Sequence, residues 1–293
     1  MGRSSKDKRD IYYRLAKEEG WRARSAFKLL QINEEFNIFK GVKKVVDLCA
    51  APGSWSQVLS RQLRPNKESD SDIKIVAVDL QAMAPIDGVI QIQGDITQIS
   101  TAEKIIEQFD GQKSDLVVCD GAPDVTGLHD IDEYVQGQLL LAALNITTHL
   151  LKDGATFVAK IFRGRDVTTL GSQLKIFFQS VTIAKPRSSR NSSIESFVVC
   201  EKFKLPPMYT PHMFNPLLHD AAALELEKLE GNNRCIVPFI ACGDLSGFDS
   251  DMTYSIQTRP DEGTYISKEP TQAPINPPYQ EACDRKKRDQ LIK

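Results

Sequence analysis

The sequence predicts an α/β fold with a doubly wound, mainly parallel sheet, followed by a proline-rich extension. Seven apolar runs rich in Val, Ile and Cys alternate with segments of helical periodicity. The runs are mostly continuous rather than alternating, which is typical of strands covered on both faces. The end of the chain differs, since ten of the fifteen prolines lie within residues 206–293. We therefore expect one domain over residues 1–205 and an extended arm over residues 206–293.

The boundaries of the expected elements follow from the apolar runs and their stop signals. The predicted strands are Val42–Leu48, Ile73–Leu80, Val89–Gln93, Leu116–Asp120, Thr156–Phe162, Val181–Ala184 and Ser196–Phe203. The predicted helices are Trp21–Phe36, Ser56–Arg64 and Asp132–Lys152, the last of them ended by Asp153-Gly154.

Composition favours a reduced, cytoplasmic globular protein. Apolar residues make up 41% and charged residues 26% of the chain, as in ordinary globular domains. No apolar run approaches the ~18 residues of a membrane span, and the first residues lack a signal-peptide core. The six cysteines include no C-x-x-C pair, and the four histidines show no metal-binding spacing. We therefore expect no membrane association and no metal site.

Charge is distributed unevenly along the chain. Residues 1–28 hold nine basic against four acidic residues, and residues 160–190 hold seven against one. Residues 206–293 reverse the balance, with thirteen acidic and nine basic residues. Two basic stretches in a slightly acidic protein indicate a local surface for a polyanion, although solvated surface cations are the alternative.

A short loop after the first strand indicates a ligand site. Residues 50–57 read Ala-Ala-Pro-Gly-Ser-Trp-Ser-Gln and join a strand to a helix, which directs backbone N–H groups at a ligand beyond the strand. Gly53 is the loop's one glycine, whereas a dinucleotide site requires G-x-G-x-x-G. The loop therefore suits a ligand without a pyrophosphate, such as S-adenosylmethionine, and argues against a nicotinamide oxidoreductase.

Four aspartates follow predicted strands at the edge where a ligand crevice is expected. They are Asp47, Asp79, Asp95 and Asp120. Asp79 is placed to accept hydrogen bonds from ribose hydroxyls, and Asp95 to meet the exocyclic amine of an adenine. Any one of these aspartates alone would be better explained as a helix cap or a turn residue. Four of them at one edge of the sheet favour a ligand-binding site.

Lys160 interrupts an apolar strand, where an unpaired ammonium group is costly. Either its side chain reaches water from the strand end, or carboxylates in the crevice hold it. Asp120, which ends the neighbouring strand, and Glu195, which opens the last strand, are the predicted partners.

Five dispersed segments resemble the FtsJ/RrmJ family of S-adenosylmethionine-dependent RNA ribose 2′-O-methyltransferases. They are residues 20–29, 47–57, 115–123, 159–164 and 188–195, and the resemblance covers about residues 8–203. It implies a Rossmann-like methyltransferase fold. It also implies a catalytic tetrad of Lys28, Asp120, Lys160 and Glu195, and cofactor contacts from Gly53, Trp55, Asp79, Asp95 and Asp120.

Further segments are similar to the eukaryotic cytosolic branch that methylates tRNA anticodon loops. They include residues 81–85, 121–129 and 185–190, and residues 237–239, 242–245 and 277–283 of the arm. This resemblance implies action on the wobble or first loop nucleotide, with a WD-repeat or helical-repeat protein partner. A ribosomal-RNA or messenger-cap 2′-O-methyltransferase and, less favoured, a non-catalytic RNA-binding subunit are the alternatives. Ile236–Ala241 is the candidate docking segment.

The chemistry expected of such a site leaves one question open. Desolvation and Lys28 would lower the pKa of Lys160, while Asp120 and Glu195 would raise it. We expect Lys160 to act partly as a charged positioning group. The predicted RNA-binding residues around the site are Arg22, Arg24, Arg163, Arg165, Arg187 and Arg190, which would grip phosphates without reading sequence.

Overall fold

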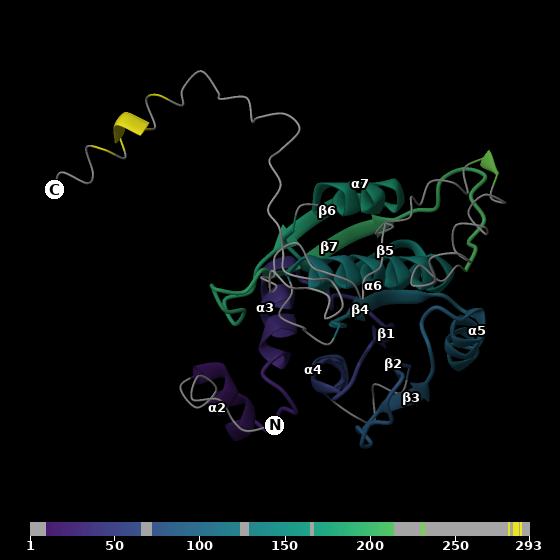
Figure 1. The fold of residues 1–293 in the computed structure, drawn as a ribbon. Coiled ribbons are helices and arrows are strands. Elements are labelled where there is room, and N and C mark those ends of the chain that lie inside the picture. The colour runs from purple at the N-terminus through teal and green to yellow at the C-terminus, as the bar shows by residue number, and fades with distance from the viewer. Residues whose placement is uncertain are drawn as a thin grey trace, which may run out of the picture. The chain divides into compact units, whose positions relative to one another are not determined.

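A seven-stranded sheet forms the centre of the protein (Figure 1). The computed structural model describes residues 10–65, 72–123, 129–164 and 167–213, together with 230–231, 281, 284–286 and 288. The strands are β1 (Lys44–Leu48), β2 (Lys74–Asp79), β3 (Val89–Gln93), β4 (Ser114–Cys119), β5 (Leu151–Phe162), β6 (Phe178–Ala184) and β7 (Glu195–Phe203). All seven predicted strands are present; β3 has its predicted bounds, and the other six are shifted at one or both ends.

The strand order β3-β2-β1-β4-β5-β7-β6 confirms the predicted doubly wound, mainly parallel sheet. Strands β1 to β5 pair in parallel, and β7 runs antiparallel between β5 and β6. The order reverses between β1 and β4, so the chain leaves these two strands toward opposite faces of the sheet. In open α/β sheets this switch point is where a ligand crevice opens.

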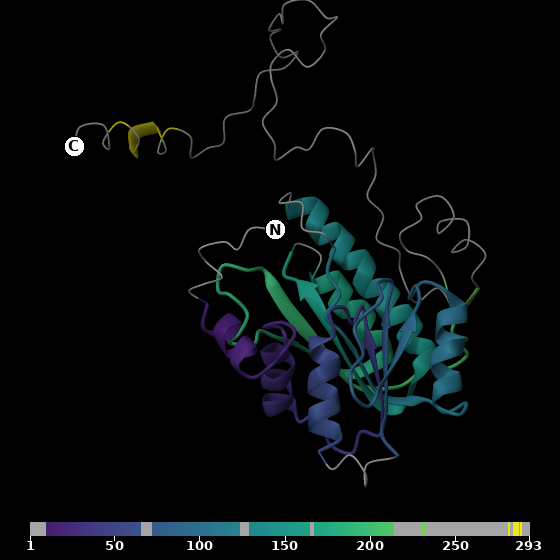
Figure 2. The ribbon, with the colours of Figure 1, turned by 90° about the horizontal axis from the view of Figure 1, so that it is seen from below.

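Helices cover both faces of the sheet (Figure 2). The helices are α2 (Ile11–Glu18), α3 (Ala26–Phe36), α4 (Ser54–Leu63), α5 (Ile99–Gln108), α6 (His129–Leu150) and α7 (Val167–Phe177). One apolar core lies between the sheet and α3 with α4, and it includes Leu29, Trp55 and Val118. The other joins the opposite face to α5, α6 and α7. Burial on both faces explains why the central strands are continuously apolar.

The boundary between α6 and β5 differs from its prediction. The helix ends at Leu150, where the Ser114 hydroxyl donates to the Leu150 carbonyl at 3.0 Å. The predicted stop, Asp153-Gly154, lies instead inside β5, and Gly154 has φ +79°. The pairing of β5 with β4 shifts register beside this segment, between Ser114 and Leu116. The glycine therefore permits an irregularity in the strand rather than a helix end.

The first helices also differ from expectation. Residues 21–25 are not helical, because tertiary contacts use their backbone: the Arg22 N–H donates to the Gln57 side chain, and the Trp55 indole donates to the Ser25 carbonyl. Helix α2 was not predicted. Asp10 caps it by accepting from the N–H groups of Tyr12 and Tyr13.

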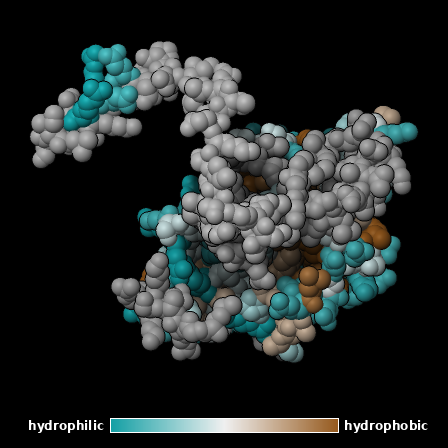
Figure 3. Space-filling view, in the orientation of Figure 1, coloured by the Kyte–Doolittle hydropathy of each residue, from teal (hydrophilic) through white to brown (hydrophobic). Residues whose placement is uncertain are grey.

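The described surface is mainly hydrophilic, with few hydrophobic residues on the face shown in Figure 3. Among the described helices, none is both long and apolar enough to cross a membrane. The described residues from 10 to 213 belong to one compact unit. Tyr209 lies beyond the predicted boundary at residue 205, yet its ring packs edge-on against Phe177 of α7. Most of the predicted arm, including Ile236–Ala241, lies outside the described residues.

Candidate active site

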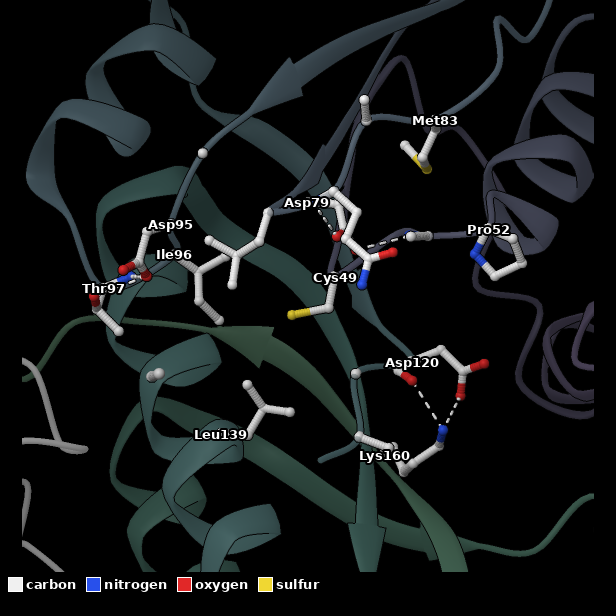
Figure 4. A pocket seen from close by; sticks show the side chains of 18 of the residues that line it. Cys49, Pro52, Asp79, Met83, Asp95, Ile96, Thr97, Asp120, Leu139 and Lys160 are labelled. Atoms are coloured by element: carbon white, nitrogen blue, oxygen red, sulfur yellow. Dashed lines mark hydrogen bonds and ion pairs between the residues drawn. The ribbon is translucent and has the colours of Figure 1, made fainter. Parts of the chain in front are cut away.

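A pocket of about 980 Å³ opens at the carboxyl ends of the parallel strands. Asp79 ends β2, Asp95 lies two residues beyond β3 and Asp120 follows β4, and all three line the pocket as predicted. Figure 4 shows Asp95 at one end, the Lys160–Asp120 pair at the other, and Asp79 and Cys49 between them. Ile96, Leu139 and Met83 add apolar wall. Three carboxylates beside apolar surface form a site suited to a cationic ligand with an aromatic part.

Asp79 and Asp95 each shape the loop that carries them. Asp79 accepts hydrogen bonds from the N–H groups of Ala51 and Gln81, both at 2.8 Å. It thereby ties the loop after β1 to the loop after β2. Asp95 accepts hydrogen bonds from the N–H and the hydroxyl of Thr97, both at 2.8 Å. It thus also has the role of a turn residue, which the sequence offered as the alternative to a ligand contact. These bonds use only part of each carboxylate, since two oxygens offer about four acceptor positions.

Gly53 and Trp55 were predicted to contact the cofactor, and neither is among the residues that line the pocket. Gly53 has φ +100° at the start of α4, and a Cβ there would lie 2.7 Å from Ile86 and 2.8 Å from Arg22. Only glycine therefore fits this turn. The Trp55 side chain is buried in the core, where it donates to the Ser25 carbonyl at 2.9 Å and packs on Phe197. The structure does not bring this side chain to the pocket.

Asp47, the first of the four aspartates, is fully buried behind the loop and does not line the pocket. Its Oδ2 accepts from the Ser56 hydroxyl at 2.6 Å, while its Oδ1 has no hydrogen-bond partner. Burial raises the pKa of Asp47 to about 7, with repulsion from Asp120 and Asp79 added and the Ser56 hydrogen bond opposing. Asp47 therefore supports the loop rather than contacting a ligand.

The structure brings the four predicted tetrad residues together from four elements. Lys160 on β5 and Glu195 on β7 share a face of the sheet, because Glu195 pairs with Phe162, two residues beyond Lys160. Helix α3 covers this face and supplies Lys28. The Lys160 Nζ lies 2.8 Å from both the Asp120 carbonyl oxygen and Oδ1, and 3.5 Å from Glu195 Oε1. Lys28 Nζ lies 2.5 Å from the same Oε1.

Two ammonium groups thus share the two tetrad carboxylates, and this sets their protonation. Lys160 is only 9% exposed, so it does not reach water as the alternative required. Burial lowers the pKa of Lys160, but Asp120 and Glu195 outweigh burial and hold the pKa above its usual value. Burial likewise raises the pKa of Glu195, yet Lys28 and Lys160 bring it below the usual range. Lys160 and Glu195 are therefore both charged at neutral pH.

Five of the six predicted RNA-binding arginines are described, and they fall into three groups. Arg163 and Arg187 are exposed. Arg24 and Arg190 instead pair with Asp10, and Arg24 also donates to the Ser188 carbonyl. Arg22 donates to the backbone carbonyls of Pro52, Ala84 and Pro85, which braces the pocket rim. Arg165 lies outside the described residues.

Some site residues were not predicted from the sequence. Ser189 donates to Glu195, and Lys185 supports the same loop with three hydrogen bonds. Asp10 joins two arginines across the chain. Cys49 has φ +54° and lines the pocket. The sequence does contain a cluster of Lys, Ser and Arg residues before the last strand, but this cluster does not reveal which side chains form hydrogen bonds with one another. Among the described residues no group of three potential metal ligands is present.

Comparison with known proteins agrees with this geometry. The chain is 65% identical over 294 residues to tRNA (cytidine(32)/guanosine(34)-2′-O)-methyltransferase of Mus musculus, covering 100% of this chain and 89% of the mouse protein. It is 58% identical to the protein of the same name from Schizosaccharomyces pombe, with 98% of each chain covered. A crystal structure of a ribosomal RNA methyltransferase from Plasmodium falciparum matches with a TM-score of 0.56 and 28% identity, covering 62% of this chain and 98% of that one. The FtsJ-like methyltransferase family matches residues 21–203. The chain therefore belongs to the FtsJ-like methyltransferase family.

Proposed function

We propose that this protein methylates ribose 2′-hydroxyl groups in the anticodon loop of cytosolic tRNA, at the wobble nucleotide, the first loop nucleotide or both. The observation that carries the proposal is the charged Lys-Asp-Lys-Glu cluster at one end of a pocket large enough for a cofactor and a nucleoside. The relatives named as tRNA 2′-O-methyltransferases support the substrate, because they match the whole chain, arm included.

The pocket has hydrogen-bond acceptors of the kind that S-adenosylmethionine requires. Asp79 and Asp95 have acceptor positions left for ribose hydroxyls and an adenine amine. Asp79 and Asp95 lie apart from the Lys160–Asp120 pair (Figure 4) and favour a cation beside them. When bound, S-adenosylmethionine supplies a methyl group activated by the sulfonium charge. Trp55 contributes through the core that supports α4.

Lys160 acts as a charged hydrogen-bond donor to the ribose 2′-oxygen. Its raised pKa keeps the ammonium form at neutral pH, so it does not serve as a neutral base. It fixes the hydroxyl and stabilises negative charge on the oxygen as the hydroxyl proton passes to solvent water. Asp120 and Glu195 hold the ammonium in place, and Lys28 balances the second carboxylate. Positioning of this kind supplies much of the rate in a displacement at an activated methyl group.

Exposed arginines beside the cluster grip the RNA backbone. Arg163 follows β5 directly and Arg187 lies in the loop before β7, so both stand near the strand ends that carry Lys160 and Glu195. Such contacts position RNA through its phosphates, and unpaired loop bases then supply sequence choice. For the arm, we propose docking of a WD-repeat or helical-repeat protein at Ile236–Ala241. Deletion of residues 206–293 should then abolish co-purification of that partner.

The test is to map ribose methylation on tRNA from cells that lack this protein. Wild type and the surface variant Lys175→Ala should restore methylation of the anticodon loop, whereas Lys160→Ala should not. Lys175 is an exposed residue of α7 and serves as the matched control. Unchanged anticodon loops in the deletion cells would contradict the proposal and direct the search to ribosomal RNA and messenger caps.

A further inference from the structure

The loop between β6 and β7 contains a lysine whose three donors all point at the base of the catalytic cluster. Lys185 Nζ donates to the Glu195 carbonyl at 2.7 Å, to the Ser193 carbonyl at 2.8 Å and to Ser189 Oγ at 3.2 Å. An ammonium group has three N–H donors and no acceptor, so these contacts use it fully. Lys185 therefore has no donor left for a substrate in this arrangement.

The third of these bonds fixes the direction of the Ser189 hydroxyl. Because Ser189 Oγ accepts from Lys185, its own hydrogen is free to be donated elsewhere. Glu195 Oε2 lies 3.0 Å away and is the acceptor in reach. Ser189 is 3% exposed, so water does not compete freely for this hydrogen. A chain of hydrogen bonds thus runs from Lys185 through Ser189 to Glu195.

That chain determines how the Glu195 carboxylate faces the catalytic lysines. Oε2 is occupied by Ser189, which leaves Oε1 for Lys28 at 2.5 Å and Lys160 at 3.5 Å. The loop is held from the other side as well, since the Ser188 N–H donates to Gln31 of α3 at 2.9 Å. Free rotation of the carboxylate would break this division of its two oxygens.

On the basis of the proposed function, we propose that Lys185 and Ser189 are positioning residues of the methyl transfer. They act through Glu195, whose clamped carboxylate sets the place of the Lys160 ammonium. Neither touches the reacting atoms, so their loss should lower the rate of the chemical step and leave binding of cofactor and RNA unchanged.

The proposal also predicts a change in pH dependence. Glu195 is faced by Lys28 from α3, by Lys160 from β5 and by Ser189 from the loop before β7. Lys185 of the same loop interacts electrostatically with Glu195, and also with Arg163 and Lys28. The Ser189 hydrogen bond is one of the interactions that lower the pKa of Glu195. Its removal raises that pKa, so the acidic limb of the rate profile should move to higher pH.

The test compares Ser189→Ala with Ser189→Thr in single-turnover methyl transfer by the full-length protein. We expect the alanine variant to be about tenfold slower at neutral pH, with the acidic limb shifted upward and both affinities within about twofold. The threonine variant keeps the hydroxyl and should recover most of the rate. Lys185→Met should move the limb in the same direction. The controls are Ser172→Ala and Lys175→Met on the exposed side of α7.

A double-mutant comparison separates this role from general support of the fold. In a Glu195→Gln background, Ser189→Ala should cause no further loss of rate, because both substitutions disrupt the same interaction between Ser189 and the Glu195 carboxylate. If the two substitutions instead lower the rate independently, so that their effects multiply, the proposal is overturned. It is also overturned if Ser189→Ala has the wild-type rate and the wild-type acidic limb of the pH–rate profile. A ¹³C titration of the Glu195 carboxyl needs no RNA, and there Ser189→Ala should raise the pKa. If tRNA is not methylated but this shift is seen, the proposed function fails and the positioning role stands.

Discussion

The two halves of the sheet edge each hold a buried carboxylate, and the pKa values of the two carboxylates are shifted in opposite directions. On the β1 side, Asp47 is fully buried with one hydroxyl partner, and burial raises its pKa to about 7. On the β7 side, Glu195 is 12% exposed, yet its pKa lies below the usual range. Burial raises the pKa in both places. The difference is that Lys28 and Lys160 stand beside Glu195, whereas Asp47 faces only other carboxylates, Asp120 and Asp79.

This difference separates the tasks of the two halves. Asp79 and Asp95 lie at the part of the pocket away from the lysines of the tetrad, and their carboxylates favour a cation, which suits the half that holds the cofactor. The tetrad half is internally neutralised, with two ammonium groups against two carboxylates. It therefore presents a fixed donor rather than an unpaired charge. The predictions below test the contrast, beginning with the largest effect.

Replacement of Glu195 should disturb the tetrad most. In Glu195→Gln, Lys28 and Lys160 lose their shared anion and repel each other, which lowers the pKa of Lys160. We expect single-turnover methyl transfer to slow by about 10- to 100-fold, and the alkaline limb to move to lower pH. Glu201→Gln on the same strand should behave as wild type. An unchanged rate and alkaline limb in Glu195→Gln would mean that the carboxylate does not hold Lys160.

At the β1 part of the sheet edge, replacement of Asp47 should stabilise the protein at high pH. The folded state keeps a proton on Asp47 up to a pKa of about 7, against 3.8 for an ordinary aspartate. Stability gained from that proton is complete below pH ~4 and is lost as pH rises to ~7. Asp47→Asn remains neutral and can still accept from Ser56.

We therefore expect Asp47→Asn to be more stable than wild type at pH 8, by about 2–3 kcal/mol more than at pH 5. Urea unfolding at the two pH values measures this difference. Asp153→Asn, an exposed position on β5, should show no such pH dependence. A stability gain of Asp47→Asn that is equal at both pH values would contradict the raised pKa.

The smallest expected effects concern the arginines. Arg163→Ala and Arg187→Ala remove exposed charges, so each should reduce the logarithmic salt dependence of tRNA binding by about 0.7. Arg24→Ala removes a charge already paired with Asp10 and should reduce it less. Fluorescence titration of tRNA at several salt concentrations measures the three slopes. Equal slopes for all three variants would show that pairing with Asp10 does not decide which arginines meet phosphate.

Much of the site could be predicted because strand ends and the chemistry of single residues are visible in the sequence. A lysine inside an apolar strand must find a carboxylate, and aspartates after parallel strands must meet at one edge. What remained hidden depends on partners far apart in the chain. Nothing local shows that Trp55 turns into the core, that Asp10 binds Arg24, or that three backbone carbonyls hold Arg22.

The sign of the Lys160 shift was hidden for the same reason. Burial lowers the pKa of Lys160, while the charges of Asp120 and Glu195 raise it, and the size of each effect depends on distances that only the fold sets. Asp153-Gly154 was misplaced because a glycine with positive φ serves equally in a helix end and in an irregular strand, and side-chain bonds from β4 ended the helix first.

The most direct test of this account is an NMR titration of the Lys160 side chain, followed through its ¹³Cε and ¹⁵Nζ signals and assigned by their loss in Lys160→Arg. The account predicts an ammonium group whose pKa exceeds the ordinary 10.5, so no titration should occur between pH 6 and 9. A neutral amine at pH 8 would contradict the account and make Lys160 a general base.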